Sequence, residues 1–384
     1  MRITHVTAHN WRNFKNLDFE LGDRLFVVGP NASGKSNLLD LMRFMGDICR
    51  PGGGLAAALA ARGGLSKARS LFSRNNQHGN MVIEIDLTDG DDTWKYRLAV
   101  KSEPRGHHRP LVENELVKHN DRVILMRPNP DDIQDPERLT QTHLEQIAAN
   151  QTFRAIADHF TKTTYFHLVP QVIRHPQNSG ISASSSFGSS MISDMNATPA
   201  RTRDAWLRRI QGALTSAVPG FESLSLEVDS AGKPHLIAGY RNWRAKPTKQ
   251  NESDFSDGTL RLIGLLWTIV SAPANGGLLL LEEPELSLNS AVVRVLPTLL
   301  ALAQRDAGMQ VIITTHSPEL LDDEGVAADE VLVLQVTDDG TTATRMDVID
   351  EAADELAAEL PMSDVVEALI APENLAGLLA AARR

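Results

Sequence analysis

The chain has 384 residues, of which 42% are apolar, with a formal net charge of −11 and one cysteine, Cys49; this length suits one large domain or two with a sizeable core. The single cysteine excludes an intrachain disulfide, and the N-terminal sequence MRITHVTAHNWRN lacks the apolar segment of a secretory signal. No apolar run reaches the ~20 residues of a bilayer span. We therefore expect a cytoplasmic protein with no membrane partner. Residues 320–384 hold 16 acidic and 3 basic residues, whereas the rest has a net charge of +2, so composition neither supports nor excludes a nucleic-acid surface outside this tail.

The N-terminal third alternates strands with one helix. The segments ITHVTAH, LDFEL and RLFVV within residues 1–28 predict two or three short strands, and residues 36–49 carry the apolar spacing of a helix. A Gly-rich stretch at 51–64 interrupts this pattern. Residues 81–87 and 93–100 predict a β-hairpin with a polar turn at 89–92.

The middle of the chain is less regular, and the last third returns to alternating strands and helices. From 105 to 271 we expect, in order, a helix at 136–160, a short strand at 164–169, a Ser/Gly-rich loop at 179–190, a helix at 198–217, a strand pair at 222–228 and 234–241, and a helix at 258–271. The remainder predicts a strand at 278–282, a helix at 290–306, strands at 310–315 and 330–336, and a helical tail at 350–384.

Strands alternate with helices at both ends of the chain, which favours an α/β fold with a mainly parallel sheet flanked by helices. The hairpin segments predict an additional antiparallel β subdomain. We expect residues 1–104 and 221–349 to form the two halves of one nucleotide-binding core. Residues 105–220 are expected to be a mostly helical insertion or lid, and residues 350–384 an acidic helical tail.

The strongest local signal is a loop that fits G-x-x-x-x-G-K-[ST] in full, between an apolar strand and a helix. Glycines let the backbone N–H groups turn toward phosphates, and the start of the helix adds positive potential. Lys35 is expected to reach the β- and γ-phosphates and the Ser36 hydroxyl to bind Mg²⁺. The residues predicted to hold the nucleotide here are Gly29, Pro30, Asn31, Ala32, Ser33, Gly34, Lys35, Ser36 and the adjacent Asn37.

A pair of acids ends the apolar run LLLL at 278–281. A strand of a parallel sheet that is buried on both faces has such a continuous apolar sequence. Ligands of open α/β sheets bind at the carboxyl ends of the strands. Glu282 is therefore expected to hold Mg²⁺, directly or through water, and Glu283 to orient and activate the attacking water.

Two further motifs lie near these acids in the sequence. The apolar strand at 310–315 ends in His316, which is expected to contact the γ-phosphate or the attacking water. The segment FSDGT, with Ser256 and Gly258, opens the helix that precedes the acidic strand; Ser is a good N-cap residue and glycine permits close approach of another backbone. Alone, this segment is an ordinary helix start.

The order of the four motifs, GPNASGKS, FSDGT, LLLLEEPELSL and TTHS, resembles that of the ABC-type ATPases of the SMC, RecF and OLD group. It is most similar to RecF-like single-chain ATPases whose signature reads S-D-G-T. The segment HNWRNFK at 9–15 also looks like the opening Asn-Phe-Lys segment of that group. The resemblance covers residues 1–48 and 253–336 well, and the middle and tail poorly.

The resemblance implies an ATPase that uses ATP and Mg²⁺ and works as an ATP-dependent homodimer. In that group the signature, matched here by Ser256 and Gly258, closes over the γ-phosphate bound to a second subunit. Glu282 and Glu283 match the metal-binding and catalytic acids, and His316 matches the switch histidine. Residues 286–289 match a loop that touches the partner subunit. The resemblance also suggests Arg12 as a nucleotide contact and Gln77 as the metal-sensing glutamine.

The sequence departs from the group in three respects. Asp257 replaces the first of two adjacent glycines in the signature. Long heptad arms and a Cys-x-x-Cys hook are missing, so this is not a full SMC protein. Only about 65 residues follow His316, too few for the nuclease domain of the OLD branch.

Two kinds of client remain open. Basic stretches with aromatic residues at 201–209 (RTRDAWLRR) and 240–246 (YRNWRAK) could bind the phosphates of double-stranded DNA, which suits a role in DNA repair or in genome or phage defence. Alternatively these stretches form a solvated face with Trp206 as a core residue. The protein would then be a regulatory ATPase that controls a separate toxin or nuclease chain without contacting DNA. The tail is either a docking site for such a partner or a packed cap. A membrane-transporter ATPase is disfavoured by the signature.

Overall fold

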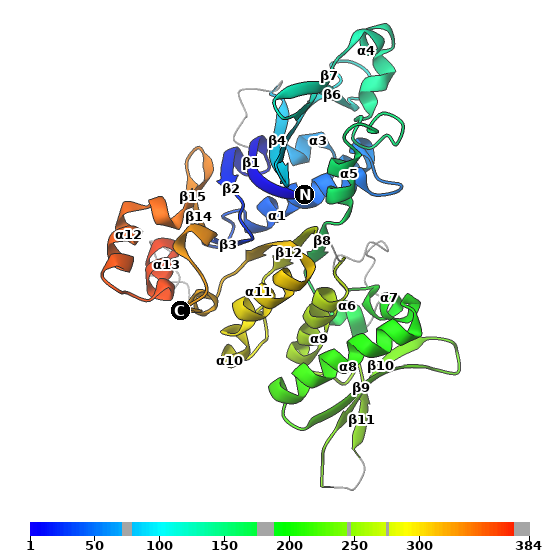
Figure 1. Cartoon of the computed structure of the whole chain (residues 1–384), viewed down its shortest axis with the longest axis vertical. Helices are drawn as coiled ribbons and strands as arrows, with labels where there is room; N and C mark the ends of the chain where they lie inside the picture. Colours follow the sequence, from blue (N-terminus) through cyan, green and yellow to red (C-terminus); the bar gives the residue numbers. More distant parts are fainter. Residues whose placement is uncertain (71–78, 175–187, 244–246, 274–275, 372–384) are drawn as a thin grey trace, which may run out of the picture. The chain divides into compact units, whose positions relative to one another are not determined.

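The computed structural model describes every residue except 71–78, 175–187, 244–246, 274–275 and 372–384 (Figure 1). Its elements fall into two units, and each is described by itself. The first unit comprises Met1–Thr164, Asn275–Leu280 and Gly308–Arg384, and the second comprises Tyr165–Ala274 and Leu281–Ala307. The chain therefore passes between the units inside the strands that contain Thr164 and Leu280.

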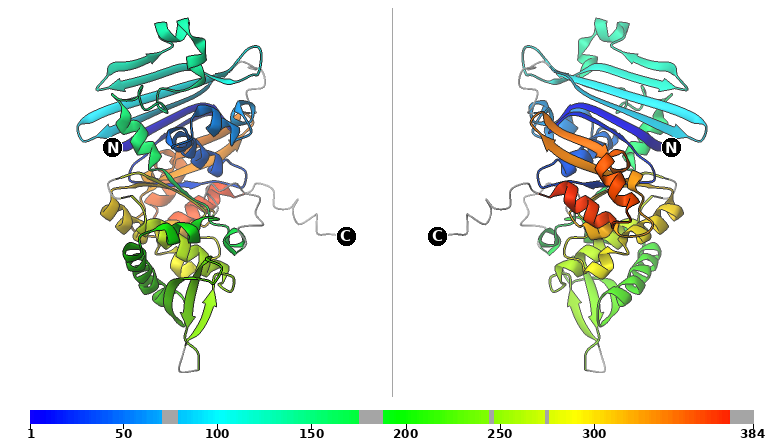
Figure 2. Two further views of the ribbon diagram at one scale, coloured as in Figure 1. Left: turned by 90° about the vertical axis from the view of Figure 1, so that its right-hand side faces the viewer. Right: turned by 90° about the vertical axis from the view of Figure 1, so that its left-hand side faces the viewer.

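The first unit contains an antiparallel sheet whose strand order is β2-β1-β4-β5-β6-β7 (Figure 2). Its strands are β1 (Arg2–Trp11), β2 (Phe14–Glu20), β4 (Met81–Asp89), β5 (Asp92–Ser102), β6 (Pro110–His119) and β7 (Arg122–Arg127). Alternate residues of β4 are buried, as the sequence pattern requires, and Asp89 pairs with Asp92 at the turn. The predicted antiparallel subdomain and hairpin are confirmed, but strands β6 and β7 were not expected.

A second six-stranded sheet, of order β15-β14-β3-β13-β12-β8, carries the predicted parallel core. Its strands are β3 (Arg24–Val28), β8 (Thr164–Phe166), β12 (Leu278–Glu282), β13 (Gln310–Thr314), β14 (Val331–Thr337) and β15 (Gly340–Arg345). Strand β3 is parallel to both β13 and β14, and β15 is antiparallel to β14. The apolar runs of β12 and β13 are buried, as expected of strands covered on both faces.

Helix α1 (Lys35–Cys49) follows β3 of this sheet and packs against β1 of the antiparallel sheet. Its apolar stripe, which includes Leu38, Met42 and Met45, is buried, and Phe44 packs against Trp11 of β1 with ring centroids 5.3 Å apart. The other helices of the first unit are α2 (Leu55–Ala60), α3 (Leu65–Ala68), α4 (Pro130–Gln134), α5 (Arg154–Thr161), α12 (Asp350–Ala357) and α13 (Met362–Ile370), with 3₁₀ turns η2 (Pro136–Thr140), η5 (Pro318–Leu321), η6 (Ala328–Glu330) and η7 (Met346–Val348).

One buried amide ties the two sheets of the first unit together. Gln310, at the start of β13, is 1% exposed. Its side chain accepts a hydrogen bond from Ile3 N (2.7 Å) and donates to the carbonyl oxygens of Ile3 (2.8 Å) and Gly22 (2.7 Å). Because these backbone groups belong to the ends of β1 and the loop before β3, Gln310 fixes where the antiparallel sheet meets the parallel one.

The helix expected at 136–160 is wrong over most of its length, because only Arg154–Thr161 is α-helical. The backbone groups that a helix would use are bound by two buried charged side chains instead. Arg127 donates to the carbonyl oxygens of Arg138 (2.9 Å) and Gln141 (2.9 Å). Glu115 accepts from the backbone N–H groups of His143 (2.8 Å) and Leu144 (3.0 Å). Long-range hydrogen bonds thus override the local helical pattern.

The second unit packs helices against a three-stranded antiparallel sheet of order β11-β10-β9 (Figure 1). Its elements are α6 (Pro170–Arg174), α7 (Met191–Ala197), α8 (Ala200–Ala217), β9 (Phe221–Val228), β10 (Pro234–Tyr240), β11 (Thr248–Asn251), α9 (Asp257–Val270), α10 (Ser290–Val293) and α11 (Leu296–Ala307). Trp206 of α8 packs edge-on against Trp267 of α9, with centroids 5.3 Å apart. The single helix expected at 290–306 is divided into α10 and α11, with Pro297 in the first turn of α11, where proline is tolerated.

Several expectations lie partly outside the described residues or remain open. The Ser/Gly-rich loop at 179–190 falls mainly in the undescribed 175–187. The tail predicted to be helical at 350–384 forms two helices, Asp350–Ala357 and Met362–Ile370, and its last residues, 372–384, lie outside the described residues. The predicted domain boundaries do not coincide with the two units, and they stay predictions. None of the helices in the described parts of the chain has the length and apolar character needed to cross a membrane.

Candidate nucleotide-binding site

The phosphate loop follows β3 and precedes α1, as the motif predicts. Gly34 has φ +102°, and a Cβ at this position would lie 2.1 Å from the Asn13 side chain. A Cβ at Gly29 would lie 2.8 Å from the carbonyl oxygen of Leu334 in β14. Both positions therefore require glycine, because the loop backbone passes directly against neighbouring groups.

Three features of the loop suit a phosphate. Lys35 is 6% exposed and its Nζ donates to the carbonyl oxygens of Gly29 (2.7 Å) and Pro30 (3.1 Å), so the ammonium lies inside the loop. The buried Ser33 Oγ has no hydrogen-bond partner among the described residues. Helix α1 has Gly34 at its N-cap, no side-chain cap and no acidic residue in its first turn. Uncapped N–H groups, a helix N-terminus and a cation together match an anionic phosphate.

His316 follows β13 and is exposed. Val27 of β3 lies opposite Thr314 of β13 in the parallel register, and Thr315 N donates to Val27 O (3.2 Å). Two residues further along these strands come Gly29 and His316. The register therefore brings the histidine to the edge of the sheet where the phosphate loop begins, although its predicted contact with phosphate or water stays a prediction.

The structure describes two of the remaining predicted site residues, Arg12 and Asn37. Arg12 donates to Asp40 Oδ2 of α1 (2.9 Å), so its guanidinium is held one turn beyond Ser36. Asn37 donates its side-chain amide to Asn13 Oδ1 (2.8 Å). Gln77 lies outside the described residues. Their roles at the nucleotide stay predictions.

In the second unit, Glu282 lies beside two side chains that the sequence did not single out. It accepts a hydrogen bond from the Tyr165 hydroxyl, and its Oε2 is 3.8 Å from Nδ1 of His167. Only 12% of the Glu282 side chain is exposed. Tyr165 and His167 are over 110 residues away in sequence and carry no motif, so no local signal could have found them.

The signature and the loop after the acids lie against each other within the second unit. A Cβ at Gly258 would be 2.4 Å from the carbonyl oxygen of Ser287. Ser287 has φ +61° and Glu283 has φ +45°, both in the left-handed region that non-glycine residues rarely adopt. Such strained conformations often occur at functional sites. The structure thus brings together Gly258 and the 286–289 loop.

Ser256 caps α9, as expected: its Oγ accepts from Thr259 N (3.1 Å). Arg174 of α6, which the sequence did not indicate, holds this helix start by donating to Phe255 O (2.6 Å) and pairing with Asp257 (2.7 Å). Arg261, one turn further along α9, has a buried Nε without a hydrogen-bond partner in the described parts of the chain. Burial lowers the pKa of Arg261, although Asp257, Glu283 and Glu285 oppose this shift.

The described side chains do not indicate a metal site by themselves. In the described parts of the chain, no three or more His, Cys, Asp or Glu side chains are grouped to hold a metal ion. Mg²⁺ at nucleotide sites commonly takes only one or two protein ligands, with phosphate oxygens and water as the rest. Ser36 and Glu282 therefore remain the predicted Mg²⁺ ligands. Ser36 belongs to the first unit and Glu282 to the second.

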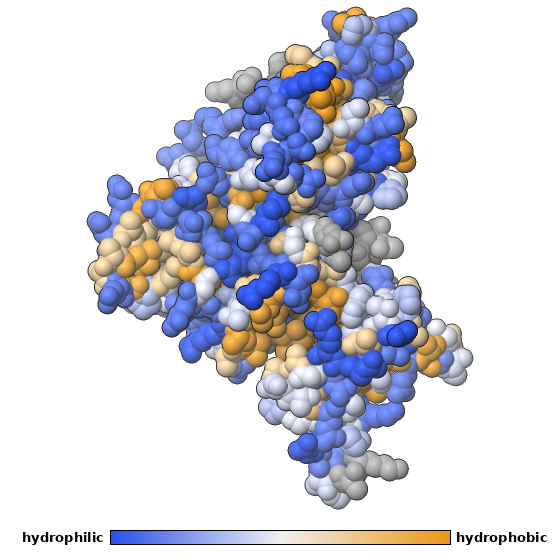
Figure 3. Space-filling model, in the orientation of Figure 1, coloured by the Kyte–Doolittle hydropathy of each residue, from blue (hydrophilic) through white to orange (hydrophobic). Residues whose placement is uncertain are grey.

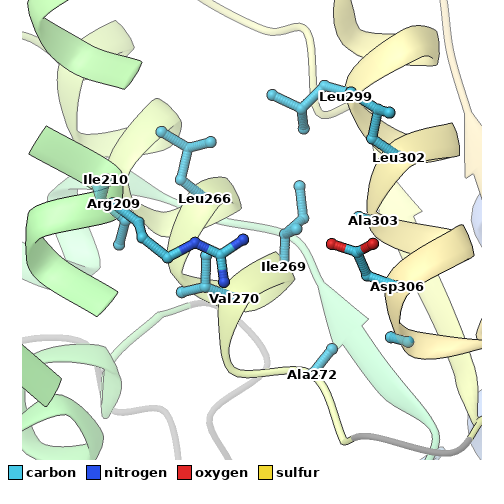
Figure 4. Close-up of a pocket in the computed structure, with 11 residues that line it drawn as sticks. Arg209, Ile210, Leu266, Ile269, Val270, Ala272, Leu299, Leu302, Ala303 and Asp306 are labelled. Atoms are coloured by element: carbon cyan, nitrogen blue, oxygen red, sulfur yellow. The ribbon is translucent and has the colours of Figure 1, made fainter. Parts of the chain in front are cut away.

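The second unit also has two adjoining hollows of about 440 and 560 Å³. They share Leu266 of α9 and Leu299 of α11, and Arg209 and Asp306 are the charged residues that line the first (Figure 4). Apolar side chains also gather on the surface over α10 and α11 (Figure 3), where Val295 and Leu302 are 54% and 53% exposed. None of the residues of the phosphate loop, neither acid of the pair at 282–283, and not His316 lines either hollow, so the hollows are separate from the predicted nucleotide site.

The residues of the two basic stretches at 201–209 and 240–246 differ in their exposure and contacts. Trp206 is a packing residue, as the alternative interpretation held. Arg201, Arg208 and Arg209 of α8 are exposed. Arg241 is ion-paired with Glu222, whereas Trp243 is 88% exposed. Residues 244–246 lie outside the described part of the chain.

With the fold and the motif residues in place, comparison with known proteins identifies the family. A model described as "AAA domain, putative AbiEii toxin, Type IV TA system" matches residues 25–322. The chain belongs to this family. It is therefore a P-loop ATPase-family protein, which implies ATP binding. No curated protein matches the sequence.

Solved structures place this family member among ABC-like folds. An SMC head bound to the C-terminal winged-helix domain of ScpA matches with TM-score 0.53 and 15% identity, over 90% of this chain and 98% of that chain. An SMC head from Thermotoga maritima has a lower TM-score of 0.46, with 13% identity over 91% of this chain and 100% of that chain. An SMC head from Pyrococcus furiosus with an extended coiled coil, bound to the C-terminal domain of ScpA, has a TM-score of 0.49, with 13% identity over 93% of this chain and 99% of that chain. The first match confirms the ABC-type α/β fold.

Proposed function

We propose that this family member binds Mg-ATP through residues 29–36 and hydrolyses it. The observation that carries the proposal is the phosphate loop itself. Its glycines permit close backbone approach, its helix start is uncapped, and Lys35 rests on loop carbonyl oxygens within reach of an incoming phosphate. A bound phosphate would accept hydrogen bonds from the Lys35 ammonium and from the uncapped N–H groups at the start of α1.

In the proposed reaction each acid has its own role. Glu282 helps hold Mg²⁺, whose charge stabilises the transferred phosphoryl group, and Glu283 orients and deprotonates the attacking water. His316 contacts the γ-phosphate or that water. Ser256 and Gly258 of a second copy close over the γ-phosphate, so that ATP joins two chains and hydrolysis releases them. The contact of Gly258 with the 286–289 loop supports this, since both would face the partner.

The family description supports a role in genome or phage defence more directly than one in DNA repair. Two clients remain candidates. Exposed Arg201, Arg208 and Arg209 on α8 and the exposed Trp243 support contact with double-stranded DNA. The family's link to toxin–antitoxin systems, and the ScpA domain bound to a similar head, support the alternative of a regulatory ATPase that controls a separate toxin or nuclease chain.

The test of the proposal is steady-state ATP hydrolysis by the wild type and by Glu283→Gln. We expect the variant to keep ATP binding but to lose hydrolysis by about 100-fold or more, because a positioned base contributes at least that factor. It should also accumulate as an ATP-bound dimer in light scattering. Glu351→Gln, an exposed acid of α12, is the control and should behave as wild type. Normal hydrolysis by Glu283→Gln would remove the assigned role.

The same assay separates the two clients. Stimulation of hydrolysis by double-stranded DNA that fades with rising salt would support the DNA-associated role, since phosphate contacts release counterions. Hydrolysis indifferent to DNA would favour a protein client.

A further inference from the structure

The turn between β1 and β2 lies directly against the phosphate loop within the first unit. Asn13 Nδ2 donates to the carbonyl oxygen of Ser33 at 2.7 Å. A Cβ on Gly34 would lie 2.1 Å from the same Nδ2 atom. The contact is therefore so close that it exists only because residue 34 is glycine.

The Asn13 amide is held in this orientation from two other sides. Asn37 Nδ2 donates to Asn13 Oδ1 (2.8 Å), which leaves the Asn13 amino group to face the loop. Asn13 Nδ2 also donates to the hydroxyl of Thr341 (2.6 Å) in β15, and Thr341 N donates back to Asn13 O (3.0 Å). Thr341 is 4% exposed. These contacts hold the Asn13 side chain in one orientation against the loop.

The bond to Ser33 has a consequence for the next residue. A trans peptide is planar, with its C=O and N–H pointing in opposite directions. Holding the Ser33 carbonyl toward Asn13 therefore directs the Gly34 N–H away from Asn13. This N–H belongs to the uncapped start of α1, where backbone donors bind phosphate.

We propose that Asn13 is a positioning residue for ATP: by binding the Ser33 carbonyl it aims the Gly34 N–H at the nucleotide phosphates. The inference rests on the proposed nucleotide site and adds to it a residue outside the loop. Asn13 acts through the backbone and does not touch the nucleotide.

A purely structural role must be separated from this one, because Asn13 also joins the loop to β15. Thr341→Val removes the side-chain bond from Asn13 to β15 but leaves the Ser33 carbonyl bond and the backbone bond from Thr341 N to Asn13 O in place. Asn13→Ala and Asn13→Asp both remove the donor to Ser33, and only the second adds a charge. Asn16→Asp makes the same chemical change three residues along, where the exposed Asn16 side chain contacts His9 of the neighbouring strand β1.

The experiment is titration with a fluorescent ATP analogue, together with KM and kcat for ATP and the thermal midpoint without nucleotide. We expect both Asn13 variants to bind about tenfold more weakly, the effect of losing one well-placed hydrogen bond, and KM to change more than kcat. Thr341→Val should lower the thermal midpoint without weakening binding, and Asn16→Asp should match the wild type.

Two results would overturn the proposal: unchanged binding by Asn13→Ala, whether or not Asn13→Asp binds more weakly, or an equal loss in Thr341→Val. If neither Asn13 variant folds, Asn37→Ala, which frees the Asn13 amide to rotate, should weaken binding several-fold, and unchanged binding would again overturn it. Failure of the wild type to bind the analogue would instead refute the nucleotide site itself.

Discussion

At the scale of single residues, the second unit requires glycine at position 258. Gly258 lets the start of α9 approach the Ser287 carbonyl oxygen, where a Cβ would be 2.4 Å away. Glu283 and Ser287 hold left-handed backbone conformations nearby. Such conformations cost on the order of 1–3 kcal/mol each, so the surrounding structure must hold them in place.

We therefore expect Gly258→Ala to displace either the start of α9 or the 286–289 loop. Hydrolysis should fall by about tenfold or more, because small displacements of positioning groups have such effects. ATP binding to the phosphate loop should persist. The control is Gly212→Ala in α8, where a Cβ meets nothing within 4 Å; it should keep activity and raise stability by up to about 1 kcal/mol. Wild-type hydrolysis by Gly258→Ala would contradict the expectation.

At the scale of elements, one buried charge network organises the segment after β7. Arg127 is fully buried and pairs with Glu115 (3.0 Å) and Asp132 (2.8 Å). Burial raises the pKa of Glu115 despite Arg127. For Asp132, burial also acts to raise the pKa, but hydrogen bonds from Arg127 and the Asn129 backbone outweigh it and lower the pKa to about 2. The network replaces the helix that the local sequence predicts.

Arg127→Met should lower the free energy of unfolding by about 3–5 kcal/mol, because it leaves Glu115 buried without its cation and Asp132 with only the more distant Arg138 (3.4 Å). Urea denaturation at neutral pH measures this change. Arg122→Met, on the exposed end of the same strand, is the matched control and should cost less than about 0.5 kcal/mol. Equal stabilities for the two variants would show that the network is not important for the fold.

At the scale of the whole molecule, the site residues divide between the two units. The phosphate loop and His316 belong to the first unit, and the signature with Glu282 and Glu283 belongs to the second. The negative charge is also uneven, since residues 320–384 carry 16 of the 49 acidic side chains. The stability of the whole molecule in acid depends on which of its titrating groups are buried.

We expect stability to fall on mild acidification because of His159. This side chain is 5% exposed, and burial lowers its pKa from 6.5 to about 4. Between these values the unfolded chain binds a proton that the folded chain does not, so stability is full above pH 6.5 and falls as pH drops toward 4, by up to about 3 kcal/mol. Urea midpoints at pH 7.5 and 5 measure the loss. His159→Leu should reduce it, whereas the exposed His107→Leu should not.

The sequence by itself determined the features whose residues are contiguous. The phosphate loop, the capped start of α9, the buried strands β12 and β13 and the hairpin β4–β5 all follow from short-range spacing, because backbone geometry relates neighbouring residues directly. The tertiary structure alone decided the contacts of Asn13 with Ser33 and Thr341, of Tyr165 with Glu282, and of Arg127 and Glu115 with the backbone after β7. These join segments up to 328 residues apart. No local pattern encodes them, since their free energy is gained only when the folded chain brings distant polar groups together away from water.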